Sequence, residues 1–224
     1  MLARIVEAIA PAPADAMVEI GPGEGALTAP LLEKLGVLHA IELDRDLAAS
    51  LRARFPALVV HEGDVLEFDF ATLPAGLRVV GNLPYNLSTP ILFHVAACAG
   101  RVRDMHFMLQ REVVERMVAP PSTPAYGRLS VSLQARFRMT KLLDVSRGAF
   151  RPPPKVESAV VRMVPLEAPL AIDEDLLRRA FSARRKTLRN ALPGVDFAAL
   201  GIDPKLRPEN LSAEDYARIS ACAR

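Results

Sequence analysis

The stretch Val18-Glu-Ile-Gly-Pro-Gly-Glu-Gly25 decides the fold of this chain. It begins in a short β-rich run, Met17 to Ile20, and its three glycines let the backbone turn sharply and approach a ligand closely. A helical pattern from Ala26 to Leu35 follows at once. A strand, a glycine-rich turn and a helix in this order are typical of a nucleotide-type binding site at the edge of an α/β sheet.

The spacing of the glycines narrows the kind of ligand. A glycine turn alone also fits a tight turn that binds nothing. No Gly-Lys-Ser/Thr sequence follows, as a triphosphate-binding loop requires, and the spacing differs from G-x-G-x-x-G. We therefore expect neither a bound triphosphate nor a pyrophosphate. The chain also has no candidate residue for hydride transfer, which argues against an NAD-binding dehydrogenase.

Around the glycine loop, β-rich runs alternate with helical stretches, which predicts an α/β fold with a mainly parallel sheet covered by helices. Two late runs are expected to pair antiparallel at the sheet edge, which makes seven strands. The predicted strands are 17–20, 37–42, 58–61, 77–80, 105–109, 141–146 and 156–164. The predicted helices between them are 26–35, 46–54, 89–97 and 111–118.

The last quarter of the chain differs from the rest. After a linker at Pro165 to Pro169, only helical patterns remain, at 173–181, 184–192 and 212–223. We therefore predict two domains, residues 1–167 with the sheet and a small all-helical domain at residues 168–224.

Composition limits the class of protein. The chain has 224 residues and a formal net charge of +2, so its total charge alone does not indicate a nucleic-acid-binding protein. Cys98 and Cys222 lie far apart and form neither a disulfide framework nor a metal-ligand spacing, which favours a reducing compartment. Residues 1–10 carry Arg4 and Glu7, unlike a signal peptide, and no apolar run is long enough to cross a bilayer. We expect a cytoplasmic protein without a membrane span.

The histidines do not indicate a metal site. They show no ligand spacing and fall in strand or helix patterns, so we expect them to pack and expect no bound metal; they are His39, His61, His94 and His106.

Two acidic residues stand at the ends of successive predicted strands. Glu42 ends the second strand, and Asp64 follows the third within Glu62-Gly-Asp-Val65. A carboxylate matches the spacing of the two ribose hydroxyls, and Asp64 can accept a hydrogen bond from an adenine amino group. Either acid alone is more typical of a solvated strand end. Together, beside the glycine loop, they predict an adenosine pocket along the carboxyl edge of the sheet.

The most informative string is Val80-Gly-Asn-Leu-Pro-Tyr-Asn86, after the fourth strand. An adenine amine is a poor nucleophile because its lone pair is delocalised into the ring. Acceptors on its two N–H groups favour a pyramidal, more reactive nitrogen, and the Asn82 side-chain oxygen and the Leu83 carbonyl can supply them. Pro84 would fix the loop, and Tyr85 would stack on a flipped-out base. The alternative is a proline turn with a half-buried tyrosine.

With these motifs in place, the chain resembles the ribosomal RNA adenine dimethyltransferase family, which methylates two adjacent adenosines near the end of small-subunit rRNA. The resemblance covers nearly the whole sequence. It is carried by Glu19-Ile-Gly-Pro-Gly, Ile41-Glu-Leu-Asp-Arg-Asp46, Gly81-Asn-Leu-Pro-Tyr-Asn-Leu-Ser-Thr-Pro90, Phe107-Met-Leu-Gln110, Tyr126-Gly-Arg-Leu-Ser130, Ala149-Phe-Arg-Pro-Pro-Pro-Lys-Val-Glu-Ser158 and Arg184-Arg-Lys-Thr-Leu-Arg-Asn190.

The resemblance implies a Rossmann-like class I methyltransferase domain, S-adenosyl-L-methionine as cofactor and a role in assembly of the small subunit. It implies a catalytic set of Asn82, Leu83, Pro84, Tyr85 and, as the second aromatic near the target base, Phe150. Carried over in the same way, the cofactor site comprises Glu19, Gly21, Gly23, Glu42, Leu43, Asp64, Val65 and Asn82. No general base or nucleophile is required, since the sulfonium of the cofactor activates the methyl group.

One departure concerns the N-terminus. Family members carry an additional stretch with a Gln-Asn-Phe-Leu-like motif that helps to close over the cofactor, and this sequence begins beyond it. A truncated start and a form that binds cofactor and RNA more weakly are the two alternatives.

Basic residues gather in the second predicted domain and beside the aromatic site. Arg178, Arg179, Arg184, Arg185, Lys186 and Arg189 are expected on its helices, while Arg147, Arg151 and Lys155 flank Phe150. Clustered basic side chains suit phosphate contacts, although a solvated basic helix has the same composition. We expect a monomer that binds small-subunit rRNA within the pre-assembled small ribosomal subunit.

Two other functions compete with this interpretation. A related group of methyltransferases modifies a large-subunit adenine, and the Pro-Pro-Pro-Lys-Val and Arg-Arg-Lys-Thr-Leu-Arg-Asn strings argue against it. A non-catalytic RNA-binding assembly factor would keep the fold without turnover. The presence of Glu42, Asp64, Asn82 and Tyr85 argues against that second alternative.

Overall fold

A computed structural model describes residues 1–149, 154–182 and 185–222. Its contacts divide the chain into two compact units, Met1–Val114 with Thr140–Pro165 and Glu115–Met139 with Leu166–Arg224. These are called the first and second units below.

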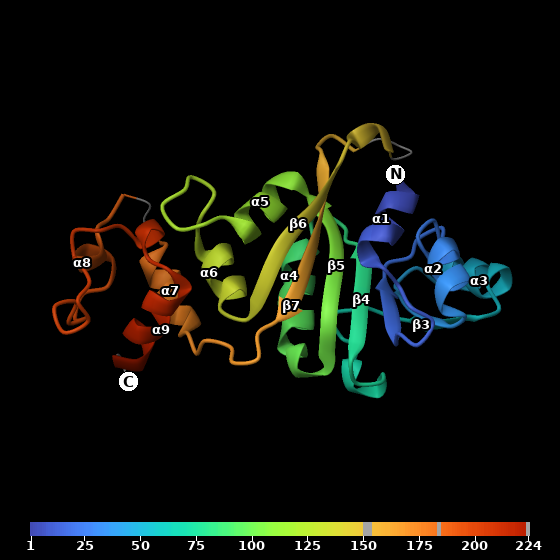
Figure 1. Ribbon diagram of the computed structural model, residues 1–224, viewed down its shortest axis with the longest axis horizontal. Helices are drawn as coiled ribbons and strands as arrows, with labels where there is room; N and C mark the ends of the chain where they lie inside the picture. The colour runs from blue at the N-terminus through green and yellow to red at the C-terminus, as the bar shows by residue number, and fades with distance from the viewer. Residues whose placement is uncertain (150–153, 183–184, 223–224) are drawn as a thin grey trace. The chain divides into compact units, whose positions relative to one another are not determined.

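A seven-stranded sheet is the frame of the fold (Figure 1). Its order is β3-β2-β1-β4-β5-β7-β6, with parallel pairing from β3 to β5 and antiparallel pairing of β5 with β7. The α/β class and the seven-stranded, mainly parallel sheet predicted from the sequence are therefore confirmed. The strands are β1 (Met17–Ile20), β2 (Leu38–Glu42), β3 (Leu58–Glu62), β4 (Leu77–Asn82), β5 (Val102–Gln110), β6 (Phe137–Val145) and β7 (Ser158–Pro165).

Helices of the first unit pack on the sheet through their apolar faces, and its central strands β1 and β4 are buried almost throughout. The first three, α1 (Leu2–Ile9), α2 (Thr28–Leu35) and α3 (Arg45–Arg54), share one buried apolar cluster with strand residues such as Met17, Leu38 and Val80. Figure 1 shows α4 (Ser88–Ala97) behind β5 and β7. The helix α5 (Arg111–Val118) follows β5, and the boundary between the two units falls within it, after Val114. Single turns of 3-10 helix lie at Phe70–Thr72, Ala99–Arg101 and Arg147–Ala149.

A buried arginine ties the end of α1 to the sheet. Arg78, on β4, donates hydrogen bonds to the carbonyl oxygens of Ile9 at 2.6 Å and Ala10 at 3.0 Å. It also forms ion pairs with Asp15 at 2.7 Å and Asp104 at 2.8 Å. The same carboxylates hold the pKa of Arg78 above its ordinary value although burial acts in the opposite direction. These bonds end α1 at a fixed place over the sheet.

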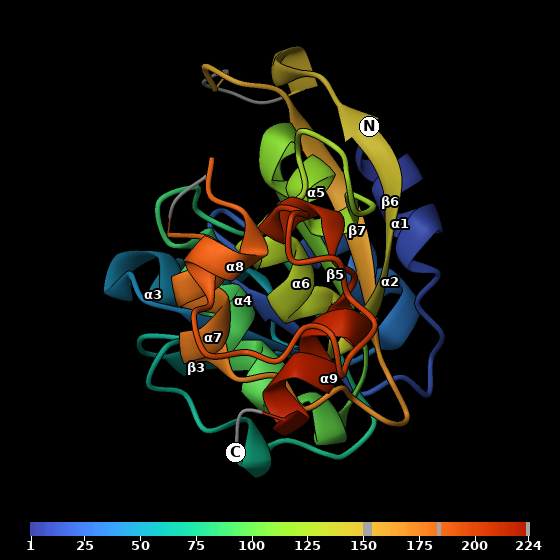
Figure 2. The same ribbon diagram turned by 90° about the vertical axis from the view of Figure 1, so that its left-hand side faces the viewer.

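The second unit is a small helical assembly. Figure 2 shows α7 (Glu174–Ala180), α8 (Leu188–Ala191) and α9 (Ala213–Cys222), coloured orange to red, as short helices joined by loops. They share a buried cluster with α6 (Arg128–Gln134), which explains why residues 115–139 belong to this unit. The buried hydroxyls of Tyr126 and Tyr216 donate to the carbonyls of Leu211 and Pro208. A 3-10 turn lies at Pro208–Asn210.

Two sequence expectations in this unit need correction. The helix α6 was not predicted, because it is short and its five consecutive buried residues, Leu129 to Leu133, show no amphipathic period. The predicted helix 184–192 is shorter in the structure, where α8 begins at Leu188 because its N-cap, Thr187, is extended. Arg185 and Lys186 therefore lie before the helix instead of on it.

Candidate active site

The glycine loop after β1 has the backbone geometry that its sequence predicts. Gly21, Gly23 and Gly25 have φ angles of 66°, 57° and 81°, a region that favours glycine. Space above the loop is open at Gly21 and Gly23, since a Cβ built on either residue meets nothing within 4 Å. At Gly25 a Cβ would lie 2.7 Å from the Phe55 ring, so that glycine serves packing. The loop thus leaves its ligand-facing side free.

Glu19, on β1, is a buried acid below this loop. It is 2% exposed, and the Thr28 hydroxyl donates to its Oε2 at 2.6 Å. Burial raises the pKa of Glu19 to about 7, the hydrogen bond from Thr28 lowers it in part, and the nearby Glu42 carboxylate raises it further. A carboxyl group with this pKa suits a cationic ligand group, which would stabilise its charged form.

Glu42 is the last residue of β2 and is also buried. Its Oε2 accepts from the Gly23 N–H at 3.1 Å and its Oε1 from the Asp44 N–H at 3.0 Å. These two bonds orient the carboxylate and connect it to the glycine loop. Each carboxylate oxygen of Glu42 can accept a further hydrogen bond, so the side chain can bind two adjacent hydroxyl groups.

Asp64, the acid that follows β3, lies near Glu42 at the edge of the sheet. β2 and β3 pair in register, and the Gly63 N–H donates to the Glu42 carbonyl at 2.9 Å. Asp64 and Val65 are half-buried, and Asp64 Oδ1 accepts from the Leu66 N–H at 2.8 Å. Leu43 is 64% exposed at the same edge. The structure therefore brings Leu43, Asp64 and Val65 to the strand ends next to Glu42.

The loop after β4 carries the predicted catalytic residues. Asn82 ends the strand and is exposed, whereas Leu83 is buried and its N–H donates to the Met108 carbonyl at 3.1 Å. Gly81 allows β4 to approach β1 closely, because a Cβ there would lie 2.7 Å from the Ile20 carbonyl oxygen. Pro84 is exposed and Tyr85 is half-buried. The Tyr85 hydroxyl lies 2.7 Å from the Ser158 hydroxyl on β7.

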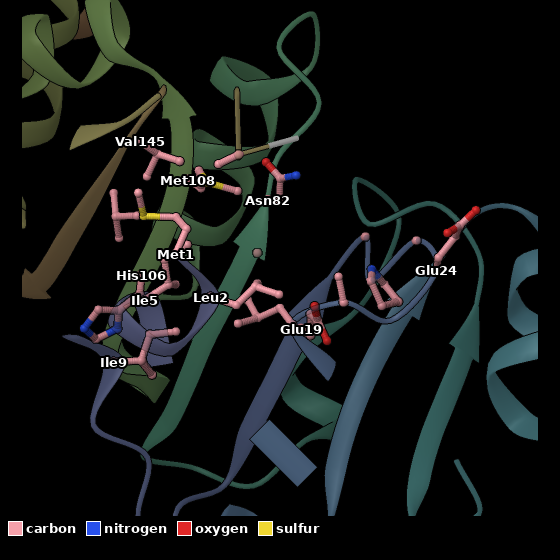
Figure 3. A pocket seen from close by; sticks show the side chains of 18 residues that line it. Met1, Leu2, Ile5, Ile9, Glu19, Glu24, Asn82, His106, Met108 and Val145 are labelled. Atoms are coloured by element: carbon pink, nitrogen blue, oxygen red, sulfur yellow. The ribbon is translucent and has the colours of Figure 1, made fainter. Parts of the chain in front are cut away.

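A cavity of about 510 Å³ joins the glycine loop to the end of β4. Four predicted site residues line it: Glu19, Gly21, Gly23 and Asn82. In the view of Figure 3, Glu19 lies near Leu2, Asn82 lies farther from both at the end of β4, and Glu24 points away from the other labelled side chains. Glu42, Leu43, Asp64, Val65 and Tyr85 are not part of the lining. The predicted site therefore consists of a cavity and, beside it, a more open edge at β2 and β3.

The sequence did not identify the other wall of this cavity. One part of this wall consists of Met1 and the α1 residues Leu2, Ile5 and Ile9. The other part comes from β5, β6 and β7 and consists of His106, Met108, Val145 and Val160. Figure 3 shows His106 between Ile5 and Ile9. Its buried Nδ1 has no hydrogen-bond partner among the described residues, and burial lowers the pKa of His106 to about 4. His106 was expected to pack because it falls in a strand pattern, but the sequence did not predict the cavity beside it.

The remaining predicted residues are exposed or lie outside the described residues. Phe150, Arg151 and Arg184 belong to the ranges that the structure does not describe. Arg147 and Lys155 in the first unit are exposed, as are Arg185, Lys186 and Arg189 in the second.

Two features of the described part of the chain bear on other functions. None of its helices combines the length and apolar character needed to cross a membrane. Nor do three or more His, Cys, Asp or Glu side chains gather there in a way that could bind a metal ion.

Comparison with known proteins places the chain in a family. The family model described as "Ribosomal RNA adenine dimethylase" matches residues 1–224. Two proteins named "Ribosomal RNA small subunit methyltransferase A" are similar: one from Aromatoleum aromaticum is 60% identical over 98% of this chain and 88% of its own length. One from Thiobacillus denitrificans is 59% identical over 97% of this chain and 90% of its own length.

Solved structures agree with this assignment. A dimethyladenosine transferase from Plasmodium falciparum superimposes with a TM-score of 0.82 and 26% identity, covering 97% of this chain and 93% of its own. The 23S rRNA methyltransferase ErmE superimposes with a TM-score of 0.75 and 25% identity, covering 98% and 95%.

Proposed function

The chain belongs to the ribosomal RNA adenine dimethylase family, and we propose that it transfers methyl groups from S-adenosyl-L-methionine to the exocyclic amines of two adjacent adenosines near the 3′ end of small-subunit rRNA. The observation that carries the proposal is the cavity between the glycine loop and Asn82 at the carboxyl ends of β1 and β4. The small-subunit assignment rests on relatives 60% and 59% identical, against 25% for the large-subunit enzyme.

The residues of the cavity fit the methionine end of this cofactor. When bound, S-adenosyl-L-methionine supplies a methyl group on a positively charged sulfur. Gly21 and Gly23 leave open space above the backbone, so a ligand can approach their peptide groups closely. Glu19 lines the same cavity and has a pKa of about 7, so a nearby cation would stabilise its charged form.

The residues at β2 and β3 fit an adenosine. Glu42 is already oriented by the Gly23 and Asp44 N–H groups, so accepting two ribose hydroxyls requires no rearrangement of its side chain. Asp64 is assigned to the adenine amino group. Leu43 and Val65 would cover the apolar faces of the ring at the same edge.

The loop after β4 would hold the target base. Asn82 projects from a strand end beside the cavity, where its amide oxygen and the Leu83 carbonyl would accept hydrogen bonds from the adenine amine. Pro84 restricts the loop, and the Tyr85 ring would stack on the extruded base. Phe150, which the sequence resemblance assigns to the same base, would be the second stacking ring. Catalysis then comes from positioning and electrostatics, and the proton leaves after methyl transfer.

The RNA would be held by exposed basic residues. Arg185, Lys186 and Arg189 in the second unit and Arg147 and Lys155 in the first are free to contact phosphates, and Arg151 and Arg184 join them by sequence. We assign the second unit to RNA binding, with the helical segment 168–224 as its larger part, and place the protein as a monomer in the cytoplasm with the assembling small subunit.

The test is methyl transfer to unmodified ribosomal subunits, with the modified positions mapped by mass spectrometry. The proposal expects dimethylated adenosines in small-subunit rRNA and none in large-subunit rRNA. Transfer to the large subunit alone would reassign the substrate. Binding to small subunits without any transfer would make the chain an assembly factor.

A further inference from the structure

The hydroxyl pair formed by Tyr85 and Ser158 joins two parts of the first unit that are far apart in sequence. Tyr85 lies in the loop between β4 and α4, and Ser158 is the first residue of β7. Their hydroxyl oxygens are 2.7 Å apart, the usual distance for a hydrogen bond between hydroxyls. In the sheet order, β5 lies between β4 and β7, so the Tyr85 side chain reaches past the end of β5.

Ser158 is held firmly enough to fix its partner. It is 1% exposed, and antiparallel pairing sets it opposite Gln110 at the end of β5. One residue earlier, the Glu157 carbonyl accepts from the Arg111 N–H at 2.9 Å, which continues the connection between the two strands. A serine on a paired, buried strand is a rigid attachment point.

Among the described residues, the other side-chain hydrogen bond at Tyr85 involves its backbone. The Ser88 hydroxyl donates to the Tyr85 carbonyl at 3.2 Å and so fixes the main chain at the start of α4. The ring itself is half-buried, so surrounding atoms do not enclose it. Because the hydroxyl lies on the long axis of the ring, a hydrogen bond at that oxygen fixes the direction in which the axis points.

We propose that Ser158 is a positioning residue for methyl transfer, which holds the Tyr85 ring in the direction that stacks on the target adenine. The proposal rests on the function assigned above, in which Tyr85 contacts the base. An unattached ring would sample other directions, and the base would lose the alignment of its amine with Asn82. A single hydrogen bond of ordinary strength corresponds to a fivefold to tenfold change in rate.

Two single variants remove this hydrogen bond from opposite ends. Ser158→Ala removes the serine hydroxyl, and Tyr85→Phe removes the tyrosine hydroxyl but keeps the stacking ring. Each should lower kcat about fivefold to tenfold, while the KM for S-adenosyl-L-methionine and the Kd for small subunits stay within about twofold. The double variant should be no slower than either single variant, since both remove the same bond.

The matched control is Ser132→Ala in the second unit. Ser132 is also 1% exposed, and its hydroxyl donates to Glu174 at 3.0 Å, so the variant loses the hydrogen bond of a buried serine that belongs to the other unit. It should lower thermal stability to a similar extent as Ser158→Ala and leave kcat unchanged.

The outcomes separate this inference from the function on which it rests. If the wild-type chain transfers no methyl groups, the proposed function fails and the inference with it. If the wild-type chain is active but Ser158→Ala and Tyr85→Phe keep its kcat, only the inference is overturned. Multiplicative losses in the double variant, or an equal loss of kcat in Ser132→Ala, would also overturn it.

Discussion

Glu19 and Glu42 are neighbouring buried acids with different hydrogen-bond partners. The Glu42 carboxylate accepts two backbone N–H groups, which orient its oxygens. Burial raises the pKa of Glu19 to about 7, although the hydrogen bond from the Thr28 hydroxyl lowers it in part. In the proposed function, Glu42 accepts neutral hydroxyls and Glu19 lies near a cation.

The raised pKa of Glu19 predicts a pH dependence of stability. Because the folded pKa of about 7 exceeds the unfolded value of 4.5, the stabilising contribution is complete below pH 4.5 and is lost as the pH rises through 7. Glu19→Gln cannot titrate, so relative to wild type it should gain about 3 kcal/mol between pH 4.5 and pH 8. Urea unfolding at both pH values measures this gain. The exposed Glu33→Gln is the control, and parallel pH profiles for Glu19→Gln and wild type would refute the assignment.

Glu42→Gln tests the proposed ribose contact. The amide keeps the shape of the side chain but replaces one acceptor oxygen with a donor, so S-adenosyl-L-methionine should bind roughly 10- to 100-fold more weakly. Calorimetric titration measures the affinity. Glu62→Gln, at the paired position on β3, removes a carboxylate bound to Arg45 and Arg52 and should leave the affinity unchanged. An unaltered dissociation constant for Glu42→Gln would show that the contact is wrong.

Much of the site was predictable at this scale because strand ends are visible in the sequence. Gly21, Glu42 and Asn82 lie at the ends of β1, β2 and β4, as their positions after β-rich runs predicted. The environment of an acid was not predictable. The pKa of Glu19 depends first on its burial and then on the hydrogen bond from Thr28, and both arise only when the loop folds over β1.

At the scale of elements, the attachment of α1 determines one wall of the cavity. Arg78 binds the carbonyls at the end of α1, and the helix lines the cavity through Leu2, Ile5 and Ile9. The sequence predicted the strand that carries Arg78 but not this role. A single arginine in a β-rich run has no pattern that reveals Asp15 or Asp104 as its partners.

Arg78→Lys should therefore loosen α1. Lysine keeps the charge, but its compact ammonium cannot reproduce the planar set of donors that reaches both carbonyls and both carboxylates. We expect a loss of about 2 to 3 kcal/mol in the free energy of unfolding, together with faster hydrogen exchange in α1 than in β4. Arg103→Lys, which alters a half-exposed partner of Asp15, should cost less than about 1 kcal/mol. Equal effects of the two variants would contradict the role of Arg78.

In the complete chain, the proposed roles divide between the two units. The first unit contains the cavity and every described residue assigned to the cofactor and the base. The second unit contains exposed basic residues around α7 and α8. The late helical segment could be predicted because strand patterns are absent from its sequence. That residues 115–139 belong to the same unit could not be predicted, because this depends on the packing of α6 against α7 and α9.

The Arg185→Ala, Lys186→Ala double variant tests the RNA-binding role of the second unit. Removing two phosphate contacts should weaken binding to small subunits and lower the slope of log Kd against log salt concentration by about 1 to 2. The Lys186→Ala and Lys34→Ala single variants form a matched pair, since Lys34 is an exposed lysine on α2 of the first unit. Identical salt slopes for the double variant and wild type would show that Arg185 and Lys186 are solvated surface residues that do not contact phosphates.

Single-turnover methyl transfer to unmodified small subunits by wild type and Asn82→Ala tests the catalytic role of Asn82. The enzyme is in excess over the subunits, the cofactor is saturating, and methylated adenosine is quantified by mass spectrometry. The proposed function predicts dimethylated adenosines with wild type, and for Asn82→Ala a rate at least about 100-fold lower with nearly unchanged rRNA binding. Equal rates for the two proteins would contradict the assignment of Asn82 as acceptor of the adenine amine and, with it, the proposed catalytic site.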